Sequence, residues 1–313
     1  MTDAPRGGIA LTGASGFVGA AIARRLAAEG WHLRLLVRAG SEARVPALAG
    51  AKIVTGALTD RAALMELLVG AQALVHCAGA VRGAAYGDFE HVNVQGTQAL
   101  LDAAAPTLRV LHISSLAARH PQLSHYAASK RAGELRVMAA LPADRRVVLR
   151  PPAVYGPGDR ELRPLLDAML RGLAIVPGPR EARFSLLHVD DLARLVACLL
   201  AGEAGWGAIH EPDDGHPGAY TWADLLAAVA RLRGRRVRGV CLPGALLSAL
   251  GAGNELLSGL LGRAPMISRG KARELRWPDW MAAGNASLAA TAWQPETDLA
   301  AGLRDTLAPG LST

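Results

Sequence analysis

Short apolar runs alternate with longer amphipathic segments through the first 150 residues of the chain. The apolar runs are rich in Val, Leu and Ile and predict strands at 9–12, 32–37, 52–55, 73–77, 109–114 and 146–150. The amphipathic segments predict helices at 17–29, 61–69, 92–105 and 126–140. Strands that are apolar throughout are typical of a parallel sheet covered on both faces. The pattern therefore predicts an α/β fold with a doubly wound parallel sheet.

The alternation of apolar runs and amphipathic segments ends after Pro151, where proline and glycine interrupt the chain repeatedly. A strand at 184–189 and a helix at 191–200 return to the earlier style, and another helix is predicted at 222–232. We therefore expect a first domain at 1–155, to which residues 184–202 return, and a smaller, mainly helical lobe made mostly of 156–313. Substrates usually bind at the carboxyl ends of such strands, so we expect this lobe to bind the substrate.

The composition indicates a folded protein in a reducing compartment. Of the 313 residues, 51% are hydrophobic and only 19% are charged, which excludes intrinsic disorder. The three cysteines, Cys77, Cys198 and Cys241, are too few and too scattered for a disulfide framework or a zinc site. The nine histidines form no cluster with ligand spacing, so no metal is expected. The first residues do not resemble a secretory signal, and we expect a cytoplasmic protein.

The net charge of +7 is mostly local. Five arginines stand within eight residues, at positions 231, 233, 235, 236 and 238, and without them the balance is 7 − 5 = +2. Such a run indicates a solvated face, and no nucleic-acid-binding motif accompanies it, so no nucleic-acid partner is expected. Residues 242–261 are the nearest candidate for a membrane span, but proline, glycine and a glutamate interrupt them. They favour a lid or core segment; contact with a membrane surface is the less favoured alternative.

A glycine-rich loop follows the first predicted strand and opens the first predicted helix. Gly13, Gly16 and Gly19 have the spacing G-x-x-G-x-x-G. Glycine allows the backbone to turn tightly and to approach a pyrophosphate, and the helix N-terminus offers free N–H groups to the anion. The order strand, glycines, helix therefore predicts a dinucleotide site. Its predicted contacts are Gly13, Ser15, Gly16, Phe17, Val18 and Gly19.

The end of the second strand bears on the choice between NAD and NADP. NAD-binding sites usually place an acidic residue there, on the ribose hydroxyls. This chain instead has Val37 and Arg38, and no carboxylate occurs before Glu42. An arginine is suited to pair with the additional phosphate of NADP. We therefore predict NADP(H) as the cofactor and Arg38 as its phosphate ligand, with use of NAD as the alternative.

Tyr126 and Lys130 are four residues apart and would share one face of a helix. A phenol titrates near pH 10, and a nearby ammonium would lower its pKa. The phenol would then exchange a proton with a carbonyl or alcohol while hydride moves to or from nicotinamide. Ser115, at the end of the fifth strand, is placed to hydrogen-bond the same oxygen, and Ser114 is the alternative. We predict Tyr126 as acid/base, Lys130 as the residue that tunes it and holds the nicotinamide ribose, and Ser115 as the orienting residue.

Together these motifs resemble the short-chain dehydrogenase/reductase superfamily. The resemblance covers nearly the whole chain and is nearest to the extended branch, which contains the epimerase/dehydratase and 3β-hydroxysteroid dehydrogenase relatives. Further matching stretches lie at 76–79, 92–97, 149–158 and 188–192. Asn93 matches the helix motif that braces the sheet. In the last stretch, capping of a helix by Asp190 or Asp191 is favoured over a catalytic role.

The resemblance also implies further cofactor contacts. The adenosine side would pass the end of the fourth strand, and backbone near the prolines at 151–152 would face nicotinamide. The additional predicted contacts are Leu58, Cys77, Ala78, Gly79, Lys130, Pro151 and Val154. Two positions depart from the family pattern. Ser115 precedes Tyr126 by only 126 − 115 = 11 residues, and Ala57 replaces the aspartate that many relatives carry beside the adenine.

The C-terminal sequence resembles 3β-hydroxysteroid dehydrogenase and dihydroflavonol reductase relatives, which implies a steroid-, isoprenoid- or flavonoid-like alcohol or ketone. Seven leucines between 246 and 261 would line its pocket, unless they are core. One alternative is a nucleotide-sugar epimerase with tightly bound NAD, for which Arg183, Arg263 and Arg276 supply cations. A second alternative is a non-catalytic dinucleotide-binding protein. The family also implies a homodimer, with Leu100, Leu101, Leu135 and Val137 as candidate contact positions.

Overall fold

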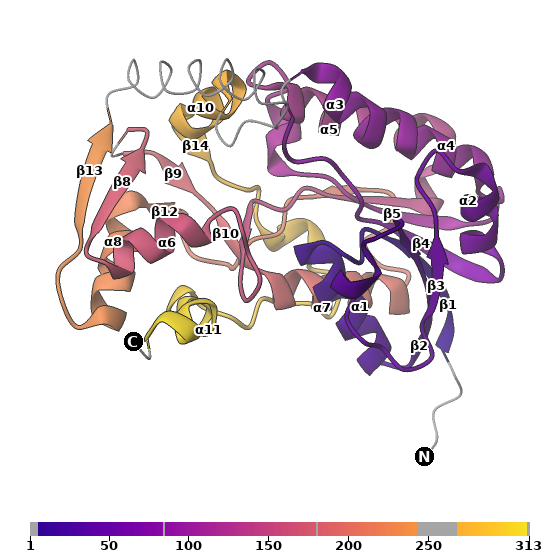
Figure 1. Ribbon diagram of the computed structural model, residues 1–313, viewed down its shortest axis with the longest axis horizontal. Helices are drawn as coiled ribbons and strands as arrows, with labels where there is room; N and C mark the ends of the chain where they lie inside the picture. The colour runs from indigo at the N-terminus through magenta and orange to yellow at the C-terminus, as the bar shows by residue number, and fades with distance from the viewer. Residues whose placement is uncertain (1–5, 84, 180, 243–267, 312–313) are drawn as a thin grey trace.

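A seven-stranded parallel sheet forms the centre of the larger part of the molecule (Figure 1). The computed structural model describes residues 6–83, 85–179, 181–242 and 268–311. The strand order is β11-β6-β5-β4-β1-β2-β3. These strands are β1 (Arg6–Thr12), β2 (Trp31–Val37), β3 (Lys52–Thr55), β4 (Ala71–His76), β5 (Arg109–Ile113), β6 (Arg146–Leu149) and β11 (Ile209–His210). Six of the seven match the strands predicted for the first 150 residues, and the doubly wound α/β fold is confirmed.

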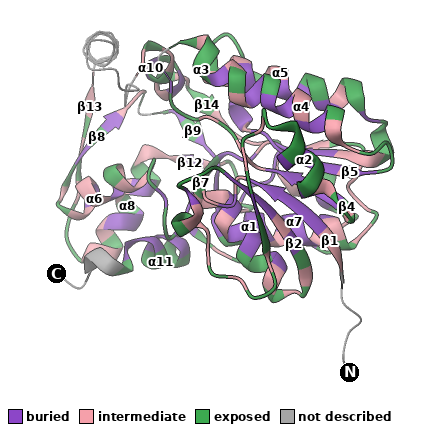
Figure 2. Cartoon of the chain, turned by 45° about the vertical axis from the view of Figure 1, so that its right-hand side comes forward, coloured by how far each residue is buried: buried purple, intermediate pink, exposed green. Residues whose placement is uncertain are grey.

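Helices cover both faces of this sheet, and the alternation of side chains along each strand explains why. Leu11 and Leu35 belong to the cluster that packs under α1 and α7, whereas Ala10 and Leu36 belong to the cluster under α2, α4 and α5. Figure 2 shows the resulting pattern, with buried strands and exposed outer helix surfaces. The helices are α1 (Phe17–Ala28), α2 (Arg61–Leu68), α4 (Gly96–Ala103), α5 (His125–Ala140) and α7 (Val189–Ala201). Both faces are therefore buried, as continuous apolar strands require.

The predicted helix at 92–105 is interrupted. The chain instead forms α3 (Tyr86–Glu90), a π-helical turn η2 (His91–Gln95) and then α4. The predicted strand at 184–189 is also divided, into β9 (Arg183–Phe184) and β10 (Leu186–His188). Neither joins the large sheet, whose last position is taken by β11. Short 3-10 turns complete this part, η1 (Glu42–Arg44), η3 (Leu116–Arg119), η4 (Ala143–Arg145) and η5 (Asn285–Leu288).

A second group of elements packs around its own apolar core, at the end of the molecule away from the large sheet (Figure 1). The helices around this core are α6 (Arg163–Leu170), α8 (Trp222–Arg233) and α11 (Leu299–Leu311), while α10 (Arg269–Arg276) lies apart from it, against the start of α5. Its strands, beside β9 and β10, are β7 (Ala153–Tyr155), β8 (Leu173–Pro177), β12 (Tyr220–Thr221), β13 (Arg238–Leu242) and β14 (Asp279–Trp280). They form the small sheets β10-β7, β12-β9-β14 and β13-β8, so this lobe contains more strand than the expected helical one.

Asp191 of α7 is hydrogen-bonded to the C-terminal segment at residues 293–297. Its buried carboxylate accepts hydrogen bonds from the amides of Glu296 (3.2 Å) and Thr297 (3.0 Å), and its carbonyl accepts one from Trp293 Nε1 (3.0 Å). The predicted capping of α7 by an aspartate is therefore wrong. The N-cap is His188, whose Nδ1 accepts from the amide of Asp190 at 3.4 Å. Asp191 acts on a segment a hundred residues away, which its motif alone does not indicate.

Three expectations concern the dimer contacts, the pocket leucines and a membrane span. Leu100, Leu101 and Val137 are buried in the core under the sheet, and of the four candidate dimer positions only Leu135 is exposed. These positions therefore give no support to a dimer. The pocket leucines at 246–261, and Arg263, lie outside the described residues. In the part of the chain that the structure describes, no helix is long and apolar enough to cross a membrane.

Candidate functional site

The glycine loop has the shape of an anion cradle. Gly13 adopts a φ of 85°, and a Cβ built on it would lie 2.7 Å from the amide nitrogen of Ala78. A Cβ on Gly19 would lie 2.1 Å from the Gly13 carbonyl oxygen, so neither position accepts a side chain. Gly16 is the N-cap of α1 and provides no side-chain cap, which leaves the first-turn amides available to an anion. This loop therefore fits the pyrophosphate of a dinucleotide.

A buried hydrogen-bond chain supports the cradle from below. The amide of Ala78 donates to Thr12 Oγ1 (3.1 Å), and Thr12 Oγ1 lies 2.8 Å from His76 Nδ1. His76 Nε2 lies 2.9 Å from Thr97 Oγ1, which donates to the carbonyl of Asn93. Burial lowers the pKa of His76 to about 3, so the ring is neutral, with Nε2 as its donor. Sequence reasoning missed this chain, because its members are single polar residues in apolar elements.

Arg38 lies in the turn after β2, where its side chain is exposed. The Ser41 amide donates to the Arg38 carbonyl (2.9 Å), and Arg44 donates to Ser41 Oγ (2.6 Å). No hydrogen bond or salt bridge within the described residues occupies the Arg38 guanidinium. Two guanidinium groups therefore stand on one turn at the end of β2. Arg44 was not predicted, although it follows Arg38 by only six residues.

The remaining predicted cofactor contacts lie along the carboxyl edge of the sheet. Leu58 is half-buried, with its side chain against Gly96. Cys77 follows β4, and burial raises the pKa of its thiol to about 11, so it stays protonated. Pro151 is buried and its carbonyl accepts from the Leu116 amide (2.9 Å). Val154 is half-buried in β7.

Tyr126 and Lys130 both lie on α5, whose N-cap is Ser124. Ser115 follows β5, and its side chain lies beside the Tyr126 phenol. Burial, together with the carboxylates of Glu274 and Glu161, raises the pKa of Tyr126 to about 12, although the polar Ser115 side chain opposes the shift. The phenol is therefore protonated at neutral pH and able to donate a proton.

Lys130 makes its hydrogen bond to the backbone and not to the Tyr126 phenol. Its Nζ donates to the carbonyl of Ile113 (2.7 Å), and the side chain is buried. Burial lowers the pKa of Lys130 to about 8, while Cys77 and Glu134 oppose the shift. The expectation that the ammonium lowers the pKa of the phenol is thus wrong in direction for this structure, because desolvation of the phenol outweighs any attraction. Nζ also lies 3.7 Å from the position that a Cβ on Gly79 would take. Lys130 is therefore close to Gly79, which is itself a predicted cofactor contact.

Ser114 points away from the phenol and into a buried ionic network. Its Oγ donates to Glu134 Oε1 (2.6 Å), and Arg150 donates to both oxygens of that carboxylate (2.8 and 2.7 Å). Arg131 also contacts Glu134 (3.0 Å), and these guanidinium groups hold the pKa of the fully buried Glu134 below its usual range. Of the two serines, therefore, Ser115 faces Tyr126 and Ser114 is occupied by Glu134.

The same network continues into the smaller lobe. Arg150 also contacts Glu211 (3.3 Å), which accepts from Arg119 (3.4 Å) and from the amide of Ala283 (3.1 Å). Arg119 additionally donates to the carbonyl of Met281 (2.7 Å). No sequence motif pointed to this network, since its ionic partners, apart from Arg131 and Glu134, are separated by 16 to 92 residues.

Asn93 braces the catalytic helix from the π-helical turn. Its side chain accepts from the Ala80 amide (2.7 Å) and donates to Ser129 Oγ (2.9 Å). Ser129 in turn donates to the Tyr126 carbonyl (2.8 Å). The loop after β4 is therefore tied to the turn of α5 that carries Tyr126, which agrees with the bracing function predicted for Asn93.

The smaller lobe closes on the start of α5. Ser124, the N-cap residue, donates to the buried carboxylate of Glu274 on α10. The ring of His120 lies against Trp277 (4.6 Å between centroids). On another side, Arg82 and Glu161 form a salt bridge (2.7 Å) between two exposed loops. Segments of both parts of the molecule therefore surround Tyr126.

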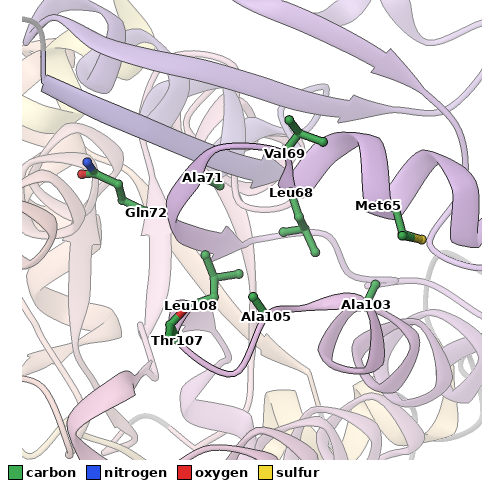
Figure 3. A pocket seen from close by; sticks show the side chains of 9 residues that line it. All are labelled: Met65, Leu68, Val69, Ala71, Gln72, Ala103, Ala105, Thr107 and Leu108. Atoms are coloured by element: carbon green, nitrogen blue, oxygen red, sulfur yellow. The ribbon is translucent and has the colours of Figure 1, made fainter.

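Two features lie apart from this site. A shallow, mainly apolar cavity of about 440 Å³ lies between α2, α4 and the loop before β5 (Figure 3). It is at the amino ends of β4 and β5, the edge opposite to Tyr126. Among the described residues, His188, Asp190 and Asp305 have ligand atoms within 4.8 Å of one another, but both carboxylates are exposed, and we assign no metal to them.

The glycine cradle and the Tyr126–Lys130–Ser115 set lie at one edge of the sheet. The model of the NAD dependent epimerase/dehydratase family matches residues 9–206, and the chain belongs to this family. It is an NAD(P)-dependent oxidoreductase of the extended short-chain dehydrogenase/reductase type. A nicotinamide dinucleotide is its cofactor class.

Two curated relatives are reductases. The chain is 38% identical to ceramide reductase of Caulobacter vibrioides over 281 residues, 89% of this chain and 87% of that protein. It is 33% identical over 230 residues to a farnesyl dihydroquinoline-oxide ketoreductase of Stigmatella aurantiaca, 66% of this chain and 68% of that protein. The finer resemblance to 3β-hydroxysteroid dehydrogenases stays a prediction.

Solved structures agree on the fold. MoeE5 in complex with UDP-glucuronic acid and NAD superposes with a TM-score of 0.72 at 20% identity, over 97% of this chain and 98% of that one. UDP-glucuronic acid 4-epimerase from Bacillus cereus gives a TM-score of 0.71 at 18% identity, over 96% and 97% of the two chains. At this level of identity the similarity concerns the fold alone.

Proposed function

We propose that this protein is an NADPH-dependent ketoreductase of a long-chain lipid, with a keto precursor of a ceramide as the first candidate substrate. The observation that carries the proposal is the place of Tyr126, beside Ser115 and one helical turn from Lys130, at the same edge of the sheet as the glycine cradle, because a phenol there can exchange a proton with the reacting oxygen. The 38% identity to a ceramide reductase over 89% of the chain supports a lipid substrate.

The residues of this chain have distinct parts in the proposed reaction. A nicotinamide dinucleotide, when bound, would supply the hydride that reduces the carbonyl carbon. Tyr126 donates its phenolic proton to the carbonyl oxygen as the C=O double bond becomes a C–OH single bond, and Ser115 orients that oxygen. Lys130 would hold the nicotinamide ribose, and the loop at residues 13–19 would hold the pyrophosphate. Arg38, with Arg44 beside it, is the proposed ligand of the additional phosphate of NADP(H).

The test is a product assay with purified enzyme. We expect NADPH oxidation with a long-chain keto-amide and a product heavier by two hydrogens in the mass spectrum. Tyr126→Phe should lower kcat by about a hundredfold or more, because the proton donor is lost. Unchanged turnover in this variant would refute the assignment of Tyr126.

The same preparation distinguishes the alternatives. Mass spectrometry of the denatured protein should find no stoichiometric NAD, and UDP-glucose should not be epimerised. Stoichiometric NAD together with epimerisation would instead favour a nucleotide-sugar epimerase. Tight dinucleotide binding without turnover of either substrate class would favour a non-catalytic protein.

A further inference from the structure

The outer face of the ribbon formed by β8 and β13 is apolar and exposed. Leu173, Ile175 and Val240 are 55%, 53% and 51% exposed, and they account for three of the eight large apolar residues exposed in the described part of the chain. The parallel register pairs Val240 with Ile175, so these side chains are neighbours on one face. A soluble protein rarely groups its exposed aliphatic residues in this way without a partner.

The opposite face of the ribbon shows why these residues are not core. Ala174 and Val176 alternate with the exposed positions and are buried against α6 and α8. A Cβ on Gly239 would lie 2.6 Å from the Leu226 side chain, so this face is already filled. The ribbon therefore buries one face and presents the other at the end of the molecule away from the large sheet (Figure 1).

Positive charge surrounds one end of this face. Arg238 is the first residue of β13 and pairs with Leu173 in the register. Arg235 and Arg236 precede it and are exposed. Arg233 joins the segment before β13 to the segment before β8, since it donates to the carbonyls of Arg236 (3.0 Å) and Arg171 (3.3 Å).

This charge is not neutralised within the described part of the chain. No salt bridge there involves Arg171 or any arginine between positions 231 and 238. An unpaired cationic cluster next to exposed aliphatic side chains is the chemistry that recognises an anionic lipid surface.

We propose that this surface, the β8–β13 face with its arginine cluster, docks the protein on anionic membrane. The aliphatic side chains enter the boundary between headgroups and acyl chains, and the guanidinium groups bind lipid phosphates. No helix among the described residues spans a membrane, and this contact requires none. The inference goes beyond the proposed reaction and does not depend on it, because binding to vesicles is measured without turnover.

The experiment is co-sedimentation of the full chain with vesicles of phosphatidylglycerol and phosphatidylcholine, compared with phosphatidylcholine alone. We expect binding to the anionic vesicles, weakened when salt is raised from about 0.05 M to about 0.5 M. Arg235→Gln, Arg236→Gln and Arg238→Gln combined should lower the partition coefficient about a hundredfold, since each basic residue contributes about fivefold.

A second triple variant, Leu173→Gln, Ile175→Gln and Val240→Gln, tests the apolar part and should lower partitioning at least about tenfold. The matched control is Met65→Gln with Val69→Gln, which removes two exposed apolar residues from the cavity of Figure 3 and should leave binding unchanged. Each variant is compared with the parent by its melting temperature and by NADPH binding.

Three results would overturn the proposal. The first is no binding of the parent protein to anionic vesicles. The second is equal partitioning of the control and of both triple variants. The third is a dimer that the apolar triple variant converts to monomer without a change in vesicle binding, which would make the face an interface between two copies of this chain.

Discussion

Replacement of Lys130 by methionine should stabilise the protein at neutral pH while it abolishes activity. Lys130 is buried, and burial lowers its pKa from 10.5 to about 8. The folded chain therefore binds this proton less tightly than the unfolded chain does. Below pH 8 the folded state must keep a charged amine out of water, and methionine removes that requirement at nearly the same volume.

The magnitude follows from the two pKa values. Their difference, at about 1.4 kcal/mol for each pKa unit, corresponds to about 3 kcal/mol of unfolding free energy. Methionine also leaves the Ile113 carbonyl without its donor, which costs about 1 kcal/mol. We therefore expect Lys130→Met to gain about 2 kcal/mol at pH 7.

The pH dependence gives the sharper test. Between pH 8 and 10.5 the unfolded chain binds more protons at Lys130 than the folded one, so the parent protein gains stability as pH rises through this window. The advantage of the variant should therefore shrink with pH and reverse to a loss of about 1 kcal/mol near pH 10.5.

Urea unfolding of both proteins at pH 7 and pH 10 measures this difference. Arg136→Met on the same helix is the control, since Arg136 is exposed and its removal should give no gain that depends on pH. An advantage of Lys130→Met that is absent at pH 7, or equal at both pH values, would refute the account of Lys130 as a buried, destabilising charge.

Four further outcomes are expected, two of them at Glu134. Glu134→Gln should lower the unfolding free energy by about 3 kcal/mol in urea titrations, because Arg150 loses its bidentate ionic partner; a loss under about 1 kcal/mol would contradict this. Because the pKa of Glu134 is lowered, its ionic stabilisation is present at neutral pH and should fade as pH falls below about 4.5. Arg38→Ala should raise KM for NADPH at least about tenfold and leave KM for NADH unchanged, whereas equal effects on both would show that Arg38 reads no phosphate. Gly19→Ala should weaken NADPH binding in a fluorescence titration at least about tenfold, since the new methyl group displaces the Gly13 carbonyl; unchanged affinity would show that the loop tolerates a side chain.

The sequence predicted the large sheet well, because its strands and helices differ in the period of their apolar residues. The alternation of Ala10 with Leu11 that sends side chains to opposite faces is a local property of β1. The π-helical turn at Asn93 was not predictable in this way. Its shape depends on contacts with Ala80 and Ser129, which lie 13 and 36 residues away.

The sequence predicted the local geometry of the candidate site where a short motif determines it. The glycine spacing predicts a turn that the φ of Gly13 realises, and the four-residue spacing places Tyr126 and Lys130 on one helix. The pKa of Tyr126 was predicted in the wrong direction, since desolvation depends on neighbours from distant segments. Glu134 and its partners Ser114 and Arg150 were missed because their contacts also join distant segments. Such pairs produce no periodic pattern in the sequence.

The attachment of the C-terminal segment to Asp191 has a consequence for the order of folding during synthesis. One cover of the large sheet consists of α1 and α7, and the core beneath them also contains Leu288 and Trp293. This layer is therefore incomplete while the nascent chain ends before Trp293, even though strands β1 to β6 have long left the ribosome. A ribosome that stalls before Trp293 would therefore release a chain with an unfinished apolar surface, and such a chain is prone to aggregate.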